Sequence, residues 1–248
     1  MRKLFYSILA LALSLTAYAQ NQQIPEKTVY VVHGQEVSVE CVDLGLPSGT
    51  LWASCNLGAA SPEAFGDYFA WAELLSKSHY DSKTYMHLKP EGMNAPAQSY
   101  QIDGRFGSIY KPLPLDIAGN ADYDAATSHL GGNWRIPNMG QFNELRKHCE
   151  WEQFTLNGVK GFKVKSKQKG NSNWIFLPAA NYKYEGNQSP NTEWLGYYWT
   201  STQNSENDAW AVKFNEGRKT IQNLRTHFYY GLSIRPVYMV KKNKKNKK

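Results

Sequence analysis

The side chains best suited to binding a ligand lie in the last third of the chain. Aromatic residues are frequent, with 8 Trp, 16 Tyr and 10 Phe, and several gather between residues 194 and 230. Flat aromatic faces stack on sugar rings, and the polar edges of Tyr and Trp form hydrogen bonds. Together with polar residues in the neighbouring turns, they give a set of predicted ligand contacts: Tyr198, Asn204, Asn207, Asp208, Trp210, Tyr229 and Tyr230.

The same residues have a purely structural interpretation. Aromatic side chains that alternate along a strand mostly pack in a core, and turns favour Asn and Asp for conformational reasons. Strand alternation places Tyr197 and Trp199 on one face of the sheet and Tyr198 on the other. Tyr198 is therefore the aromatic residue of this strand that we expect to be available to a ligand.

No group of residues predicts catalysis. The six histidines are scattered and form no His-x-x-x-His pair, and the Gly-x-Ser-x-Gly and Cys-x-x-Cys patterns are absent. The acidic residues Asp116, Asp122 and Asp124 lack the spacing of a calcium-binding loop, and Asp122 is expected to cap a helix. We therefore predict no catalytic residue, no cofactor and no metal ligand, with calcium as the alternative.

Composition and charge exclude several classes of protein. Hydrophobic residues make up 42% of the 248 residues and charged residues 20%, as in globular proteins and unlike disordered or fibrous ones. The formal net charge of +7 comes from the two ends of the chain. Between them, 20 basic residues face 21 acidic residues, so the body is not expected to bind nucleic acid specifically. The lysine-rich tail, 239–248, is expected to be disordered and to touch anionic surfaces.

The first residues predict export. Arg2 and Lys3 precede an apolar run that ends at Leu15, and a small-x-small pattern then predicts cleavage between Ala19 and Gln20. The apolar run is too short for a membrane span, and no later segment is long enough. We expect a mature protein without a transmembrane segment, either periplasmic or secreted to the cell surface.

The order of the expected elements predicts an α+β fold. A strand pair is expected over 28–32 and 36–40, a one-turn helix over 61–65, and a long irregular segment over 75–120. Short helices are expected over 122–130 and from Asn138, where Gln141 completes a capping box. Later strands are expected over 161–166, 174–177, 197–201, 209–214 and 232–237. Two helices followed by several strands indicate a mostly antiparallel sheet with long irregular loops.

Several sequence blocks resemble a known family. They are Val42–Ala53, Asn56–Ala59, Gly66–Trp71, Gly131–Pro137, Ile175–Ala180, Gly196–Ser201 and Ser233–Val237. In this order they resemble the Fibrobacter succinogenes major paralogous domain over residues 41–238. The resemblance implies an exported protein of Bacteroidetes-type bacteria with a C-type lectin-like fold, related to that of the formylglycine-generating enzyme. The expected organisation is a signal peptide (1–19), a leader with a strand pair (20–40), the family domain (41–238) and the tail (239–248).

The resemblance also has implications for the cysteines and for function. Three cysteines leave three single pairings open, and the resemblance implies a Cys55–Cys149 disulfide with Cys41 as a free thiol. Ser189 stands where related lectins carry a carboxylate ligand for calcium. The resemblance implies a fold and no reaction. Together with the predicted export, the aromatic-rich last third and the lack of a catalytic group, it leads us to expect an exported, non-enzymatic ligand-binding or adhesion domain that recognises a glycan or a surface protein. The alternatives are a degenerate formylglycine-type oxidase that depends on Cys41, another envelope enzyme, and a structural envelope component.

Overall fold

The computed structural model describes residues 24–87, 98–102, 105–109, 113–185, 187–188 and 194–240. The predicted signal peptide, its cleavage site at Ala19 and Gln20, and residues 241–248 of the tail lie outside the described residues. Among the described residues, no helix has the length and apolar character needed to cross a membrane.

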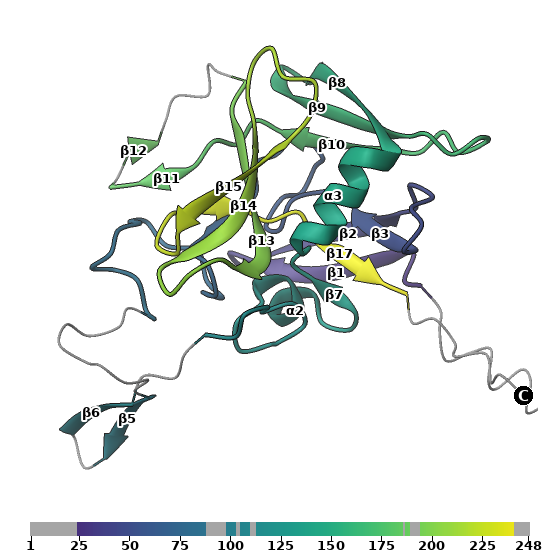
Figure 1. Cartoon of the computed structure of the whole chain (residues 1–248). Helices are drawn as coiled ribbons and strands as arrows, with labels where there is room; N and C mark the ends of the chain where they lie inside the picture. Colours follow the sequence, from purple (N-terminus) through teal and green to yellow (C-terminus); the bar gives the residue numbers. More distant parts are fainter. Residues whose placement is uncertain are drawn as a thin grey trace, which may run out of the picture.

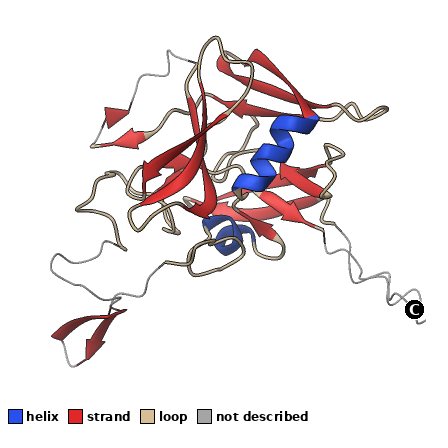
Figure 2. Cartoon of the chain, in the orientation of Figure 1, coloured by secondary structure: helices blue, strands red, loops and turns tan. Residues whose placement is uncertain are grey.

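β-strands dominate the molecule (Figure 2). Strands account for 40% of the structure and helices for 9%, so the expected α+β, C-type lectin-like fold was wrong and the fold is mostly β. The two described helices are short, with 6 residues in α2 (Ala125–Leu130) and 10 in α3 (Met139–His148). The class was misjudged because β5, β6, β8 and β15 form strands that were not expected, while the helix expected over 61–65 is absent.

The N-terminal and C-terminal segments share one five-stranded sheet, in the order β1-β2-β3-β17-β7. Its strands are β1 (Lys27–Val32), β2 (Gln35–Val42), β3 (Thr50–Ala53), β17 (Val237–Met239) and β7 (Trp134–Arg135). The predicted strand pair is confirmed, because β1 and β2 form an antiparallel hairpin. The Trp134 indole N–H on β7 donates to the Thr28 hydroxyl on β1 (2.9 Å), so a side-chain bond joins the two edge strands of this sheet.

A second five-stranded sheet carries the aromatic residues of the last third, in the order β15-β14-β13-β16-β4. Its strands are β15 (Gln222–His227), β14 (Asp208–Phe214), β13 (Gly196–Gln203), β16 (Leu232–Ser233) and β4 (Tyr68–Phe69). A three-stranded antiparallel sheet of β8 (Cys149–Leu156), β9 (Val159–Ser166) and β10 (Trp174–Pro178) lies at the top of Figure 1.

Two small hairpins complete the structure. They are β5 (Gln98–Ile102) with β6 (Arg105–Ile109), and β11 (Lys183–Tyr184) with β12 (Asn187–Gln188). The segment 75–120, expected to be irregular, therefore contains a hairpin. The one-turn helix expected over 61–65 is absent, because residues 61–64 form turns only.

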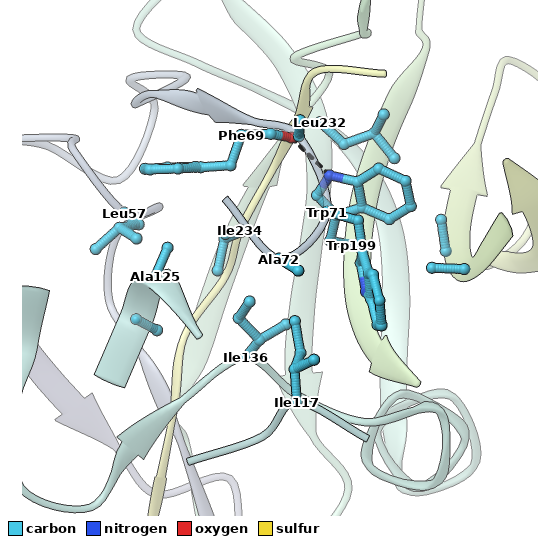
Figure 3. Close-up of a cluster of buried hydrophobic side chains, with 14 of the residues drawn as sticks. Leu57, Phe69, Trp71, Ala72, Ile117, Ala125, Ile136, Trp199, Leu232 and Ile234 are labelled. Atoms are coloured by element: carbon cyan, nitrogen blue, oxygen red, sulfur yellow. Dashed lines mark hydrogen bonds between the residues drawn. The ribbon is translucent and has the colours of Figure 1, made fainter. Parts of the chain in front are cut away.

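Two apolar clusters form the core, and β13 separates them. The first cluster contains Trp71 and Trp199, and the Trp199 indole N–H donates to the Phe69 carbonyl oxygen (2.7 Å; Figure 3). The second cluster contains Tyr198 and Phe142 of α3. Neighbouring side chains of one strand point to opposite faces, so Trp199 and Tyr198 enter different clusters.

The three cysteines are free, so the predicted Cys55–Cys149 disulfide is wrong. Cys149 ends α3 and packs in the second apolar cluster, whereas Cys55 follows β3 with its thiol 3.6 Å from the Ser54 hydroxyl. Burial raises the pKa of the Cys41 and Cys149 thiols to about 11. Thiols with such pKa values stay protonated near neutral pH, which makes them poor nucleophiles.

The helix boundaries depend on side-chain caps. Asn138 caps α3, since its side chain accepts from the Gln141 backbone N–H and the Gln141 side chain accepts from the Asn138 backbone N–H. This capping box was predicted correctly. The cap of α2 was assigned wrongly to Asp122, because Asp124 accepts from the Thr127 backbone N–H (3.1 Å). Asp124 is buried and also accepts from the Gly119 and Ile136 backbone N–H groups.

Replacing Asn138 with alanine is expected to lower the free energy of unfolding by about 1 kcal/mol, the usual effect of losing an N-cap side chain. The Gln141 N–H loses its acceptor, and the reciprocal bond loses its fixed geometry. Urea unfolding followed by circular dichroism measures the change. Asn143→Ala in the same helix is the control, since its side chain bonds only to Arg146 on the surface. Equal stability of the two variants would contradict the assigned cap.

Candidate functional site

Five tyrosines and one histidine form a partly exposed aromatic surface, which we call the tyrosine platform: Tyr182, Tyr184, Tyr197, His227, Tyr229 and Tyr230. Tyr184 and Tyr230 are stacked, with ring centroids 4.6 Å apart and an interplanar angle of 4°. Tyr229 stacks on His227 (5.1 Å, 15°) and lies 5.5 Å from Tyr230. The tyrosines are half-buried and His227 is exposed, so one side of the platform packs against the protein and the other side is accessible to solvent.

Three separate segments bring the platform together. β11 pairs with the segment after β15, since the Lys183 N–H donates to the Gly231 carbonyl (2.8 Å) and the Gly231 N–H donates back (2.9 Å). Figure 1 shows β11 beside the end of β15. Tyr197 on β13 meets Tyr182 edge to face at 5.0 Å. The platform is therefore held by backbone hydrogen bonds as well as by ring contacts.

A buried phenylalanine anchors the platform to the core. Phe228 stacks on Trp71, with ring centroids 4.7 Å apart and an interplanar angle of 16°. Its backbone N–H donates to the Asn207 carbonyl (3.1 Å), which holds the β13–β14 turn beside Tyr229. Because Phe228 points inward, its chain neighbours His227 and Tyr229 are presented at the surface.

Polar and charged groups border the rings. His227 Nδ1 lies 2.6 Å from Asp208 Oδ1, and the two residues are directly opposite each other on β15 and β14. The hydrogen bond with the Glu185 carboxylate, together with burial, raises the pKa of Tyr184 to about 12. Burial raises the pKa values of Tyr229 and Tyr230. The Tyr184 hydroxyl therefore donates to Glu185, whereas the Tyr229 and Tyr230 hydroxyls are protonated near pH 7 and can donate to a ligand.

The structure gathers several of the predicted contacts at this place. Tyr229 and Tyr230 belong to the platform, Asp208 pairs with His227, and the backbone of Asn207 bonds to Phe228. Asn204 lies at the start of the same β13–β14 turn, where its N–H donates to the Asp208 carbonyl. Four of the predicted residues are therefore in or directly beside the platform, and Asn204 is close along the chain.

Two predicted contacts lie elsewhere. Tyr198 was expected to be available to a ligand, but it is 0% exposed, and its hydroxyl donates to the Pro178 carbonyl (2.7 Å). This prediction was wrong because β13 lies inside the sheet with a packed apolar cluster on each face. Trp210 is half-buried on β14, opposite Arg225, and lies two residues from Asp208 on the same sheet face.

Sequence reasoning missed Tyr182, Tyr184, Glu185 and His227 as members or neighbours of the site. The alternation of Tyr182 and Tyr184 was an available signal, because residues two apart on a strand share a face. His227 was treated as one of six scattered histidines, since its partner Asp208 is distant in sequence and meets it only through strand pairing.

Metal binding has no candidate in the part of the chain that the structure describes. There, no group of three or more His, Cys, Asp or Glu side chains is placed to hold an ion. Of the acidic residues considered from sequence, Asp124 bonds to backbone N–H groups, and Asp116 accepts from the Ala118 N–H (3.0 Å). Their observed roles are those of local caps and turns.

Comparison with known proteins gives one match. A family described as a domain of unknown function (DUF8237) matches residues 155–237. No curated protein and no solved structure matches the chain. The matched segment runs from the end of β8 to the first residue of β17 and contains every residue of the tyrosine platform. The resemblance to the Fibrobacter succinogenes major paralogous domain stays a prediction.

Proposed function

We propose that this chain is an exported, non-enzymatic domain that binds carbohydrate through the tyrosine platform. The observation that carries the proposal is the group of half-buried tyrosine rings, two of them nearly parallel, at the end of β15. Partly exposed aromatic faces stack on the apolar faces of sugar rings, and phenolic hydroxyls bond to sugar hydroxyls.

The groups around the rings support a sugar ligand. Asp208 and Glu185 supply carboxylate acceptors, and the Asn207 side chain supplies an amide donor and acceptor within the same surface. Sugar recognition needs both kinds of contact, because each sugar ring has apolar C–H faces and a rim of hydroxyls. The phenols of Tyr229 and Tyr230 are protonated near neutral pH, so each can donate to a sugar hydroxyl.

Core packing and backbone hydrogen bonds hold the platform in place without a ligand. Phe228 is buried against Trp71, and Lys183 and Gly231 exchange backbone hydrogen bonds. Rings that are already ordered lose little conformational entropy on binding, which favours affinity for a small ligand. A ligand-binding role therefore suits the geometry better than a role that only needs a solvated surface.

A screen of neutral glycans on an array, followed by calorimetry of the best ligand, tests the proposal. Tyr230→Ala and Tyr184→Ala are each expected to weaken binding about tenfold, the loss of roughly one stacking contact. Tyr230→Phe keeps the ring and loses the hydroxyl, so it should retain more affinity than Tyr230→Ala.

The matched control is Tyr123→Ala, a half-buried tyrosine that meets His87 outside the platform. It should bind as the unchanged protein does, and thermal unfolding checks that all variants are folded. Failure of every neutral glycan to bind would reject the proposal. Equal losses in Tyr123→Ala and the platform variants would reject the platform as the site.

A further inference from the structure

We infer a second ligand site, separate from the tyrosine platform, on the outer face of the β8–β10 sheet, and we propose that it binds an acidic polysaccharide. The site consists of Trp174 with the lysines of β9 and of the β9–β10 turn: Lys163, Lys165, Lys167 and Lys169. Its sheet lies at the top of Figure 1, with the turn projecting to the right, whereas β11 lies on the left.

Strand register places Trp174, Lys163 and Lys165 on one face of the sheet, and Lys167 and Lys169 follow in the turn. Trp174 on β10 is directly opposite Lys165 on β9, and Lys163 is two residues away on the same strand. Residues two apart share a sheet face, about 6.6 Å from each other along the strand. The side chains of Val164 and Ser166 point the other way and are buried, while Lys165, Lys167 and Lys169 are exposed.

Trp174 is unusual for its exposure. Its side chain is 39% exposed at a sheet surface, although all four residues that follow it on β10 are buried. The Lys163 ammonium lies 5.0 Å from the Trp174 ring centroid and 5.3 Å from that of Phe154. Lys163 therefore holds the indole in place and adds positive charge beside its open face.

The four lysines of the site outnumber the two glutamates that lie on the same sheet face. Between residues 144 and 169 there are seven Lys or Arg and three Glu, in a body whose basic and acidic residues nearly balance. Glu150 and Glu152 are opposite Lys165 and Lys163 on β8. None of the ion pairs among the described residues includes a lysine of the site, Glu150 or Glu152.

Other charged groups near the β9–β10 turn already have hydrogen-bond partners. Glu144 accepts from Ser48, the Asp43 carboxylate accepts from the Gly45 N–H, and the Lys167 ammonium donates to the Lys147 carbonyl (3.4 Å). Because Glu150 and Glu152 balance Lys165 and Lys163, the excess of positive charge at this end of the sheet comes from Lys167 and Lys169 of the turn. Lysines attract carboxylate or sulfate groups, and the indole stacks on a sugar ring.

An acidic polysaccharide fits this combination better than the other anionic polymers. A membrane surface is bound by a cluster of apolar side chains together with basic ones, and Trp174 is the single exposed large apolar residue of this sheet among the described residues. Nucleic acid is attracted by a strongly positive domain, and the body of this chain is nearly balanced.

Binding of polygalacturonate to the purified protein, measured by calorimetry at two salt concentrations, tests the inference. We expect binding that weakens as salt rises, since the contact is partly ionic. Trp174→Ala and the double variant Lys165→Gln, Lys167→Gln should each weaken binding at least about fivefold, with each variant checked for folding by circular dichroism.

The controls separate this site from the platform and from general charge. Lys213→Gln with Lys219→Gln removes the same charge elsewhere and should leave affinity within twofold of the unchanged protein. Tyr230→Ala should also bind polygalacturonate normally, whatever its effect on neutral glycans. Absence of polygalacturonate binding would overturn the inference. Normal binding by Trp174→Ala, or equally tight binding of single-stranded DNA or phosphatidylglycerol vesicles, would also overturn it.

Discussion

Replacing Arg235 with alanine is expected to lower the free energy of unfolding by about 3–5 kcal/mol, the range for disrupting a buried polar network or truncating a large core side chain. Arg235 is 0% exposed and makes four hydrogen bonds. Its guanidinium donates to the Asn56 side chain and to the backbone carbonyls of Ala53, Ser54 and Phe176. These acceptors come from the end of β3, from the segment that follows it and from β10.

The network explains how a charge without a carboxylate partner is tolerated in the core. Burial lowers the pKa of the Arg235 guanidinium from its ordinary value, yet four acceptors at 2.6–3.0 Å replace the water that it loses. Without the guanidinium, buried carbonyl groups lose their donor, and each unmade bond costs about 1–3 kcal/mol. Arg235 therefore links β3 and β10, which belong to different sheets, by hydrogen bonds that an apolar side chain could not make.

Chemical denaturation of Arg235→Ala, Arg235→Met and Arg218→Ala measures the effect. Arg235→Met fills much of the volume without donating hydrogen bonds, so it should also be strongly destabilised. Arg218 is exposed in the β14–β15 turn, and its replacement should change stability by about 0.5 kcal/mol or less. A stable Arg235→Met protein would show that the arginine serves only to fill space.

Trp199→Ala is expected to lower the free energy of unfolding by about 3–5 kcal/mol, because it leaves a cavity in the first apolar cluster. Trp199 is 1% exposed, and its indole donates to the Phe69 carbonyl (Figure 3). The bond ties β13 to β4, which are both parts of the second five-stranded sheet but are separated in it by β16.

Trp199→Phe separates packing from hydrogen bonding in this cluster. It keeps an aromatic ring but leaves the Phe69 carbonyl without the indole donor, so a loss of about 1–3 kcal/mol is expected. Trp174→Ala, at an exposed position, should cost about 1 kcal/mol or less. Thermal and urea unfolding of the three variants gives the comparison, and equal losses for Trp199→Ala and Trp174→Ala would contradict the assigned core.

Local patterns predicted several elements well. The hairpin of β1 and β2 and the capping box of α3 depend on residues that are near one another in sequence. The strands β8 and β15 were missed, although Asn157 and Gly158 between β8 and β9 have positive φ (49° and 84°), as a two-residue hairpin turn requires. That Asn-Gly pair, with an alternating segment before it, was a usable signal for β8.

The amino-acid sequence by itself determined which residues alternate on each strand and indicated that aromatic residues gather in the last third of the chain. Only the tertiary structure decided which of these faces are open. Alternation separates Tyr198 from Trp199, but packing on both faces of β13 buries both. Tyr184, Tyr229 and His227 come together only through the pairing of β11 with the segment after β15 and of β14 with β15. A strand pattern specifies the direction of a side chain, whereas exposure depends on distant segments that pack against it.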